Sequence, residues 1–321
     1  MNAHSQGPVV MLAGGTGGAK LARGMLDVVG PDDLVVIANT GDDVEIYGGY
    51  VSPDPDLVSF WLADRIDERG WGLAGDTFEV MDGLRDLGEE VWFNLGDADL
   101  AIALLRAAGL GAGERLSVVQ ADLTRRLGLR AEVLVMSDRP VRTRIRAAGR
   151  NWSLQEYLIR GRRPDGDWPA IDDVTYVGAA GADTTPEVLA ALGAARAIVI
   201  GPSNPVLSIG PMLAIPELAA ALAASPAPTV AVSPIVGGSV LKGPTATCLA
   251  WAGVSASGDG VAALYGNRID GIVLDAPLTP AGADEAAAPD LATLVCDLMM
   301  DGAAGRRRLA AQTLTFAAGL R

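Results

Sequence analysis

The first forty residues contain an apolar run, a glycine-rich loop, a helical stretch and a second apolar run, in that order. Val9–Ala13 and Leu34–Ala38 are short, wholly apolar runs typical of buried strands, and Lys20–Val29 between them has its apolar residues at helical spacing. A strand, a helix and a second strand in this order pair the two strands in parallel through a right-handed crossover. We therefore expect an α/β fold built on a mostly parallel sheet.

The rest of the chain continues this alternation around a helix-rich middle. Half of the residues are hydrophobic and a fifth are charged, which is ample apolar material for a large core. Gly161–Trp168 is polar and rich in turn-forming residues, so it is expected to be a loop. The helices predicted in the rest of the chain are 56–66, 77–87, 100–108, 186–193, 217–224 and 306–318. The strands predicted there are 132–136, 197–200, 229–232 and 271–274. A hairpin is expected to begin at 141–145.

Four of the predicted strands end in loops of small and polar residues. The loops are GGTGG and NTGDD after the first two strands, GPSNP after residue 200 and SPIVGG after residue 232. In open parallel sheets, ligands bind beyond the carboxyl ends of the strands. We expect all four loops to gather at that edge of the sheet and to form the functional site.

The charge and the scarcity of histidine exclude several classes of function. The net charge is −14, without the basic footprint of a nucleic-acid-binding protein. The one histidine, His4, lies in the polar N-terminal stretch, so a histidine-dependent nucleophile or a histidine-rich metal site is not expected. Cys248 and Cys296 form no CxxC pattern and suit a reducing cytosol. Because neither a signal peptide nor a membrane-spanning run is visible, a cytoplasmic protein without a membrane partner is expected.

The GGTGG loop is the predicted phosphate-binding segment. Its glycines let the backbone approach a phosphate closely, the helix that follows favours negative charge at its start, and Lys20 adds a cation. The alternative is a tight strand–helix turn without a ligand. NAD binding is not favoured, because Lys20 stands at the third glycine of GxGxxG and Asn39, not an acid, ends the second strand. The candidate residues are Gly14, Gly15, Thr16, Gly17, Gly18 and Lys20.

Four aspartates lie close together in the sequence after the second strand. They are Asp42 and Asp43 in NTGDD, and Asp54 and Asp56 in PDPD. Clustered carboxylates at strand ends are suitable ligands for Mg²⁺, which often also binds a substrate phosphate. The alternative is that Asp54 or Asp56 caps the helix that follows.

Ser203, Asn204 and Pro205 form a turn whose hydroxyl and amide can bind a phosphate, a ribose or a base. Ordinary turn formation explains the same residues equally well. Three tryptophans, Trp61, Trp71 and Trp92, could stack on a ring system or belong to the core.

Nine segments in order give the chain a specific resemblance. The sequence resembles the 2-phospho-L-lactate transferases of coenzyme F-420 biosynthesis, called CofD in archaea and FbiA in actinobacteria. The segments run from about Leu12 to Gly238, and similarity is weaker beyond. They are LAGGTGGAKL, NTGDDVEIYG, VSPDPD, RGWG, LGDAD, MSD, LQE, IGPSNPVLSIGP and VSPIVGG.

The resemblance implies a doubly wound, Rossmann-like α/β fold with a helical insertion. It places one domain over residues 1–321, with the insertion and hairpin over roughly 54–170 and a disordered tail at 1–8. It also implies a Mg²⁺-dependent transfer of phospholactate, phosphoenolpyruvate or phosphoglycerate from a GDP-linked donor to the ribityl hydroxyl of the deazaflavin Fo, with release of GMP. The oligomeric state stays open, and a homodimer is one arrangement.

The resemblance also suggests roles for individual residues. Asp42, Asp43 and Asp56 would hold Mg²⁺ and act in catalysis, while Asp56 and Asn94 would contact Fo. The glycine loop, with Ser203, Asn204 and Pro205, would bind the donor nucleotide and its phosphates.

The sequence departs from the family pattern at four positions: Pro55, Leu57, Ala98, where an arginine is usual, and Ser153, where a histidine is frequent. The main alternative is a regulatory protein of the gluconeogenesis-factor type, which binds nucleotide sugars and shares a GGTG opening.

Overall fold

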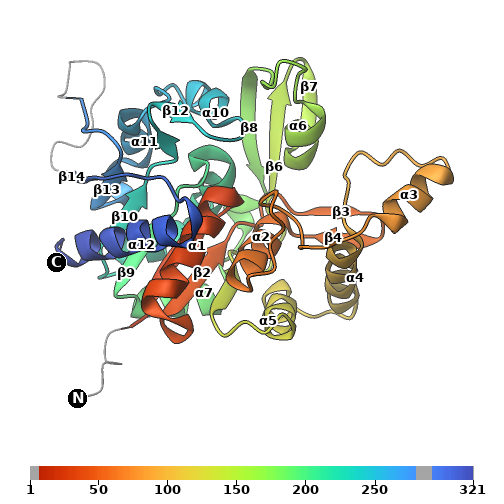
Figure 1. Cartoon of the computed structure of the whole chain (residues 1–321), viewed down its shortest axis with the longest axis horizontal. Coiled ribbons are helices and arrows are strands. Elements are labelled where there is room, and N and C mark those ends of the chain that lie inside the picture. Colours follow the sequence, from red (N-terminus) through yellow and green to blue (C-terminus); the bar gives the residue numbers. More distant parts are fainter. Residues whose placement is uncertain (1–6, 280–290, 321) are drawn as a thin grey trace.

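A seven-stranded parallel sheet forms the centre of the molecule (Figure 1). The computed structural model describes residues 7–279 and 291–320. Strand order is β14-β13-β10-β9-β1-β2-β5, and each neighbouring pair is parallel. The doubly wound α/β prediction is therefore confirmed. The strands are β1 (Val9–Ala13), β2 (Leu34–Ala38), β5 (Glu132–Val135), β9 (Ala197–Ile200), β10 (Thr229–Val232), β13 (Gly271–Leu274) and β14 (Ala292–Val295).

Helices cover both faces of this sheet, which explains why its central strands are apolar throughout. Val9 and Met11 of β1 belong to the core on one face, whereas Val10 and Leu12 belong to the core on the other. The first face is covered by α1 (Gly15–Val29), α2 (Pro53–Leu62) and α12 (Gly302–Ala318), of which α1 and α12 lie side by side (Figure 1). The second face is covered by α7 (Pro186–Ala194), α8 (Gly210–Leu213), α9 (Pro216–Ala224), α10 (Thr245–Trp251) and α11 (Gly258–Tyr265).

Two further units project from the main layers (Figure 1). One contains the hairpin β3 (Val44–Ile46) and β4 (Gly49–Val51) with helices α3 (Glu79–Asp86), α4 (Asp97–Gly111) and α5 (Leu116–Arg126). The other is the antiparallel sheet β7-β6-β8 with helix α6; its elements are β6 (Arg142–Ala147), β7 (Arg150–Ser153), α6 (Leu154–Arg160) and β8 (Ile171–Val177). Within the predicted range 54–170, most of α2 and all of β5 belong to the main layers, so this range is not one continuous insertion.

Several element boundaries differ from the predicted ones. Helix α1 begins at Gly15, because the glycine loop itself forms its first turn. Helix α2 begins at Pro53, a residue suited to a first helical position. The elements that were not predicted include α5, α6, α8, α10, α11, β3, β4, β8 and β14. Of the predicted tail, residues 1–6 lie outside the described residues, while the Pro8 carbonyl accepts a 2.9 Å hydrogen bond from the Arg196 N–H.

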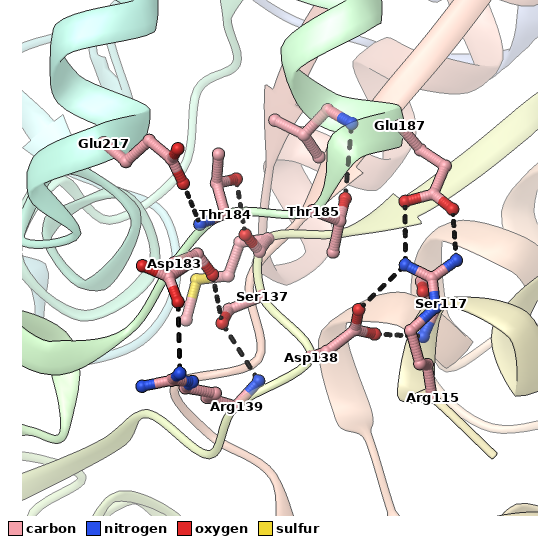
Figure 2. A network of polar contacts seen from close by, with 12 residues as sticks. Arg115, Ser117, Ser137, Asp138, Arg139, Asp183, Thr184, Thr185, Glu187 and Glu217 are labelled. Atoms are coloured by element: carbon pink, nitrogen blue, oxygen red, sulfur yellow. Dashed lines mark hydrogen bonds and ion pairs between the residues drawn. The ribbon is translucent and has the colours of Figure 1, made fainter.

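A network of hydrogen bonds and ion pairs connects helix α5 to the core (Figure 2). Asp138 follows β5, and its Oδ1 accepts the Ser117 N–H at 2.8 Å in the first turn of α5. Arg115, just before α5, forms ion pairs with Asp138 (3.2 Å) and with Glu187 of α7 (2.6 Å). The Ser137 hydroxyl donates to the Asp183 carbonyl at 2.7 Å. The MSD segment therefore anchors a projecting helix to the core.

No single helix within the described ranges is long and apolar enough to cross a membrane. The bent pair 205–213 and 216–224 meets the length and composition criteria only when taken together.

Candidate functional site

A cavity of about 420 Å³ lies at the carboxyl edge of the sheet. All four loops predicted to gather there contribute to it, so this prediction is confirmed. The hairpin of β11 (Ile235–Val236) and β12 (Ser239–Val240) and residues 298–301 complete the wall. Loop residues that line the cavity are Gly14, Gly15, Thr16, Gly17, Asp42, Pro202, Ser203, Asn204, Ser233, Pro234 and Val236.

The glycine loop packs too closely for side chains. A Cβ on Gly14 would collide with the Asp54 carboxylate and with Ser208, 2.7 Å away. Gly15 has a φ of 63°, a conformation that favours glycine. The Gly14 N–H donates to Ser203 Oγ (3.1 Å), and the Gly15 N–H donates to Asp54 Oδ1 (2.6 Å). The next N–H groups, of Thr16 and Gly17, belong to the first turn of α1, where the helix provides no acceptor.

Asp42 and Asp54 form a buried carboxylate pair in this cavity, and we call them the carboxylate pair. Burial, and then the charges of Asp54 and Asp43, raise the pKa of Asp42 well above its usual value. Burial also raises the pKa of Asp54. The side-chain donors are neutral amides: Gln155 Nε2 donates to Asp42 (3.1 Å) and Asn39 Nδ2 to Asp54 (2.9 Å). Asp42 Oδ1 is buried without a hydrogen-bond partner.

Asp43 lies next to Asp42 but does not line the cavity. Its carboxylate accepts hydrogen bonds from Ser52 Oγ (2.6 Å) and Tyr50 OH (2.9 Å). Burial raises the pKa of Asp43 to about 7, and the positive charge of Arg142 opposes this rise. Asp43 therefore has hydrogen-bond partners of its own, although its charge also acts on Asp42.

Asp56 and Asn94, the predicted Fo contacts, also lie outside the cavity lining. Asp56 forms an ion pair with the buried Arg106 of α4. Asn94 is exposed, and its Oδ1 accepts a 2.6 Å hydrogen bond from Arg85. The structure thus brings Asp42 and the glycine loop into one cavity, whose lining does not include Asp43, Asp56 or Asn94.

The GPSNP turn lines the cavity and also caps the helical turn that follows it. Ser203 and Asn204 line the cavity. Asn204 Oδ1 accepts the N–H groups of Val206 and Leu207, both at 2.9 Å, and so caps the π-helical turn η3 (Pro205–Ile209). Pro205 and Gly18 do not line the cavity.

Two cations lie at the cavity, Lys20 of α1 and Lys242 just after β12, and we call them the lysine pair. Burial, and then the charges of Lys242 and Arg306, lower the pKa of Lys20, while Asp301 acts in the opposite direction. The site residues predicted from the sequence did not include Asp54 and Lys242, which both line the cavity. Two signals in the sequence could have identified them: Asp54 belongs to the PDPD cluster, and Lys242 is the only lysine in the sequence besides Lys20.

The three tryptophans occupy different surroundings. Trp61 is only 9 % exposed, with Lys20 and Arg306 over its ring at 5.8 and 5.2 Å from the centroid. Trp92 packs against Phe93, with ring centroids 5.6 Å apart. Trp71 is 47 % exposed, and the Arg69 guanidinium lies 4.3 Å from its ring centroid.

The carboxylate pair is chemically suited to a divalent cation. Mg²⁺ is usually held by one or two carboxylates together with substrate phosphates and water. Two buried like charges and the unpartnered Asp42 Oδ1 provide such a donor set. In the described part of the chain, no group of three or more His, Cys, Asp or Glu side chains is arranged to hold a metal. A cation at this pair would therefore need ligands from the substrate.

Fold and site together define a doubly wound α/β protein with a glycine-rich loop and an acidic pair at the carboxyl edge of its sheet. The chain belongs to the 2-phospho-L-lactate transferase CofD family, whose model matches residues 9–313. It is 42 % identical over 277 residues to a phosphoenolpyruvate transferase from Kitasatospora aureofaciens, covering 83 % of this chain and 84 % of the relative. It is 35 % identical over 268 residues to a 2-phospho-L-lactate transferase from Methanosarcina mazei, covering 83 % and 86 %.

A solved structure with the same fold comes from Bacillus halodurans, a member of the UPF0052 family. It aligns with a TM-score of 0.61 and 16 % sequence identity, covering 96 % of this chain and 99 % of that one. At this identity the likeness concerns the fold alone.

Proposed function

We propose that this protein transfers a three-carbon phospho-acid from a GDP-linked donor to the ribityl hydroxyl of Fo in coenzyme F-420 biosynthesis. The membership in the CofD family supports this reaction class. The observation that carries the proposal is the composition of the cavity. The glycine loop, the carboxylate pair and the lysine pair all line one space of about 420 Å³. Phosphoryl transfer depends mainly on positioning and charge stabilisation of this kind and needs no protein nucleophile.

The donor's diphosphate would lie against the glycine loop. Backbone N–H groups at the start of α1 and the ammonium of Lys20 are suited to its negative oxygens. Ser203 and Asn204, which line the same cavity, are suited to a phosphate or ribose hydroxyl. In the reaction, the acceptor hydroxyl forms a bond to the acid-bearing phosphorus, the bond to GMP breaks, and the hydroxyl proton is released.

Asp42 and Asp54 would hold Mg²⁺, in place of the predicted set Asp42, Asp43 and Asp56. Asp43 and Asp56 have arginines beside them, whereas the carboxylate pair receives hydrogen bonds from neutral donors. When bound, the cation would neutralise charge on the donor phosphates and favour attack on phosphorus.

The acceptor would approach from the side of the projecting helices. The loop around Gly70 lies close to two residues of the proposed donor site, Thr16 and Lys242. A Cβ on Gly70 would be 3.8 Å from Thr16 Cγ2 and 3.9 Å from Lys242 Nζ. The next residue, Trp71, is half exposed and is suited to stacking on a flat tricycle. Asp56 and Asn94 remain the acceptor contacts that the family resemblance suggests.

The donor acid that we propose is phosphoenolpyruvate, the acid in the name of the relative from Kitasatospora aureofaciens and of one from Streptomyces griseus, 37 % identical over 321 residues. We propose a cytoplasmic enzyme that uses small-molecule substrates only.

The test is an activity screen with Fo, Mg²⁺ and each of the three GDP-linked acids, read by the mass of the product. We expect product with the enolpyruvyl donor and none when EDTA replaces Mg²⁺. In the same assay Asp42→Asn should give little product, whereas Asp172→Asn, which removes an exposed carboxylate from β8, should match wild type. If none of the GDP-linked acids gives product, the proposed reaction is wrong. If EDTA has no effect on product formation, the proposed cation is wrong.

A further inference from the structure

The distribution of lysine in this chain is unusual. The sequence contains 23 arginines but only two lysines, Lys20 and Lys242. They are 222 positions apart, and both line the same cavity. Nearly all basic residues of this chain are therefore arginines, and its two lysines both line this cavity.

Arginine supplies the cation of the structural ion pairs. All the ion pairs found between residues of the described ranges have arginine as the basic partner, and neither lysine takes part in one. The planar guanidinium is suited to carboxylates, which it binds through two parallel hydrogen bonds. An ammonium is a compact charge with three donors, so it fits beside a phosphate that other groups also contact.

The ammonium of Lys20 lies in a positively charged environment. The charge of Lys242 lowers the pKa of Lys20, after burial and together with Arg306, and Asp301 only partly offsets these effects. Like charges held close together are unfavourable unless an anion lies between or beside them. Lys242 follows the β11–β12 hairpin, whereas Lys20 belongs to α1, so the two charges come from segments far apart in the sequence.

We propose that Lys20 and Lys242 form a two-ammonium clamp that recognises the diphosphate of the donor, with one ammonium for each phosphate. The clamp rests on the proposed function, since its ligand is the nucleoside diphosphate end of that donor. It makes Lys242 a specificity-determining residue, because a nucleoside monophosphate can engage only one of the two ammonium groups. The product GMP is therefore held more weakly than GDP, which assists its release.

Calorimetry with GDP and GMP tests the clamp on the full chain. In Lys242→Ala we expect GDP affinity to fall by about tenfold or more, while GMP affinity changes by no more than about twofold. Lys242→Arg should not restore the preference for GDP, because the guanidinium is larger and planar. Arg307→Ala, which removes an exposed positive charge from α12, is the control and should leave the ratio unchanged.

Chemical labelling gives a second readout that needs no substitution. Since the chain has only two side-chain amines, acetylation followed by peptide mass spectrometry reports on this cavity alone. We expect GDP to protect both lysines and GMP to protect one. The clamp is refuted if the wild-type protein binds no GDP, if GDP leaves either lysine as reactive as in the free protein, or if folded Lys242→Ala keeps the wild-type GDP-to-GMP ratio. Protection by GDP without transferase activity would support the clamp and refute the proposed reaction.

Discussion

Arg106 is completely buried, and both terminal nitrogens of its guanidinium donate to the carboxylate of Asp56. Asp56 lies in the first turn of α2, which packs against α1, whereas Arg106 lies on α4 in the projecting helical unit. The same guanidinium donates to the Tyr50 carbonyl at 3.0 Å and to Gln120 Oε1 at 3.3 Å. This contact therefore joins the projecting helices to the core through a buried charge.

Asp56→Ala should destabilise the protein. Removal of one partner leaves the Arg106 charge buried and unpaired, which costs about 3–5 kcal/mol of unfolding free energy. Urea denaturation of the variant and wild type measures this difference. The double variant Asp56→Leu with Arg106→Met should recover most of the loss, because apolar replacement of a buried pair is often close to neutral. If Asp56→Ala is as stable as wild type, the ion pair contributes nothing to the free energy of unfolding. Any loss of Fo binding in this variant would then come from the loss of a contact between Asp56 and Fo.

Asp42→Asn should make the ligand-free protein more stable and catalytically inactive. The amide removes a buried like charge beside Asp54, and a gain of about 1 kcal/mol would raise Tm by roughly 2 °C. Turnover should fall by at least about 100-fold, since a proposed Mg²⁺ ligand is lost. Thermal scans in EDTA and in Mg²⁺ with GDP check both effects. Wild type should gain Tm on addition of Mg²⁺, and Asp42→Asn should not; an equal gain in both proteins would place the cation elsewhere.

Gln155 should control the affinity of the carboxylate pair for a cation. Gln155→Lys keeps a donor beside Asp42 but adds a positive charge, so it should raise the half-saturating Mn²⁺ concentration by about 10- to 100-fold in electron paramagnetic resonance titrations. Gln155→Met removes the donor without adding charge and should have a smaller effect. Gln120→Met is the control, since Gln120 is buried but hydrogen-bonded to Arg106 and Ser59 instead. Unchanged Mn²⁺ binding in Gln155→Lys would contradict this prediction.

Asp99 should make the stability of the ligand-free protein depend on pH. Burial, and then the charges of Asp56 and Asp76, raise the pKa of Asp99 to about 7, whereas an aspartate in the unfolded chain titrates near about 3.9. Between these values the folded state keeps a proton that the unfolded chain has lost, so stability falls as the pH rises through this window.

Asp99→Asn removes this dependence. At pH of about 7 the variant should be more stable than wild type by on the order of 1–3 kcal/mol, and the difference should shrink towards pH of about 4. Urea denaturation at both pH values measures it. Asp43, whose pKa is also raised to about 7, is present in both proteins, so the difference isolates Asp99. A difference that does not vary with pH would contradict a raised pKa.

The buried strands could be predicted to the residue. Val9–Ala13, Leu34–Ala38, Ala197–Ile200, Thr229–Val232 and Gly271–Leu274 have the predicted bounds, because a strand covered on both faces is a continuous apolar run that ends at glycine, proline or polar residues. The edge strand β14 lacked this signal, since its residues alternate between intermediate and exposed. The projecting elements α5 and β8 depend on contacts with distant segments, which local patterns do not reveal.

The acidic site could be predicted only in part. The sequence shows four aspartates near the carboxyl edge, and helical geometry adds that Asp54 and Asp56, two residues apart in α2, lie about 200° apart around its axis. Only one of them can therefore turn to the cavity. Which one does so is not a local property.

The sequence by itself determined the parallel sheet, the loops at its edge and the family, because these depend on short apolar runs, turn residues and the order of motifs. Tertiary structure decided the partners of each charge. Arg106 reaches Asp56 from 50 positions away, and Gln155 reaches Asp42 from 113 positions away. Packing of the projecting units on the sheet thus pairs Asp56 with a cation and leaves Asp42 and Asp54 with neutral donors. The physical reason is that electrostatic interaction and burial depend on distance in space, which the spacing of residues along the chain does not specify.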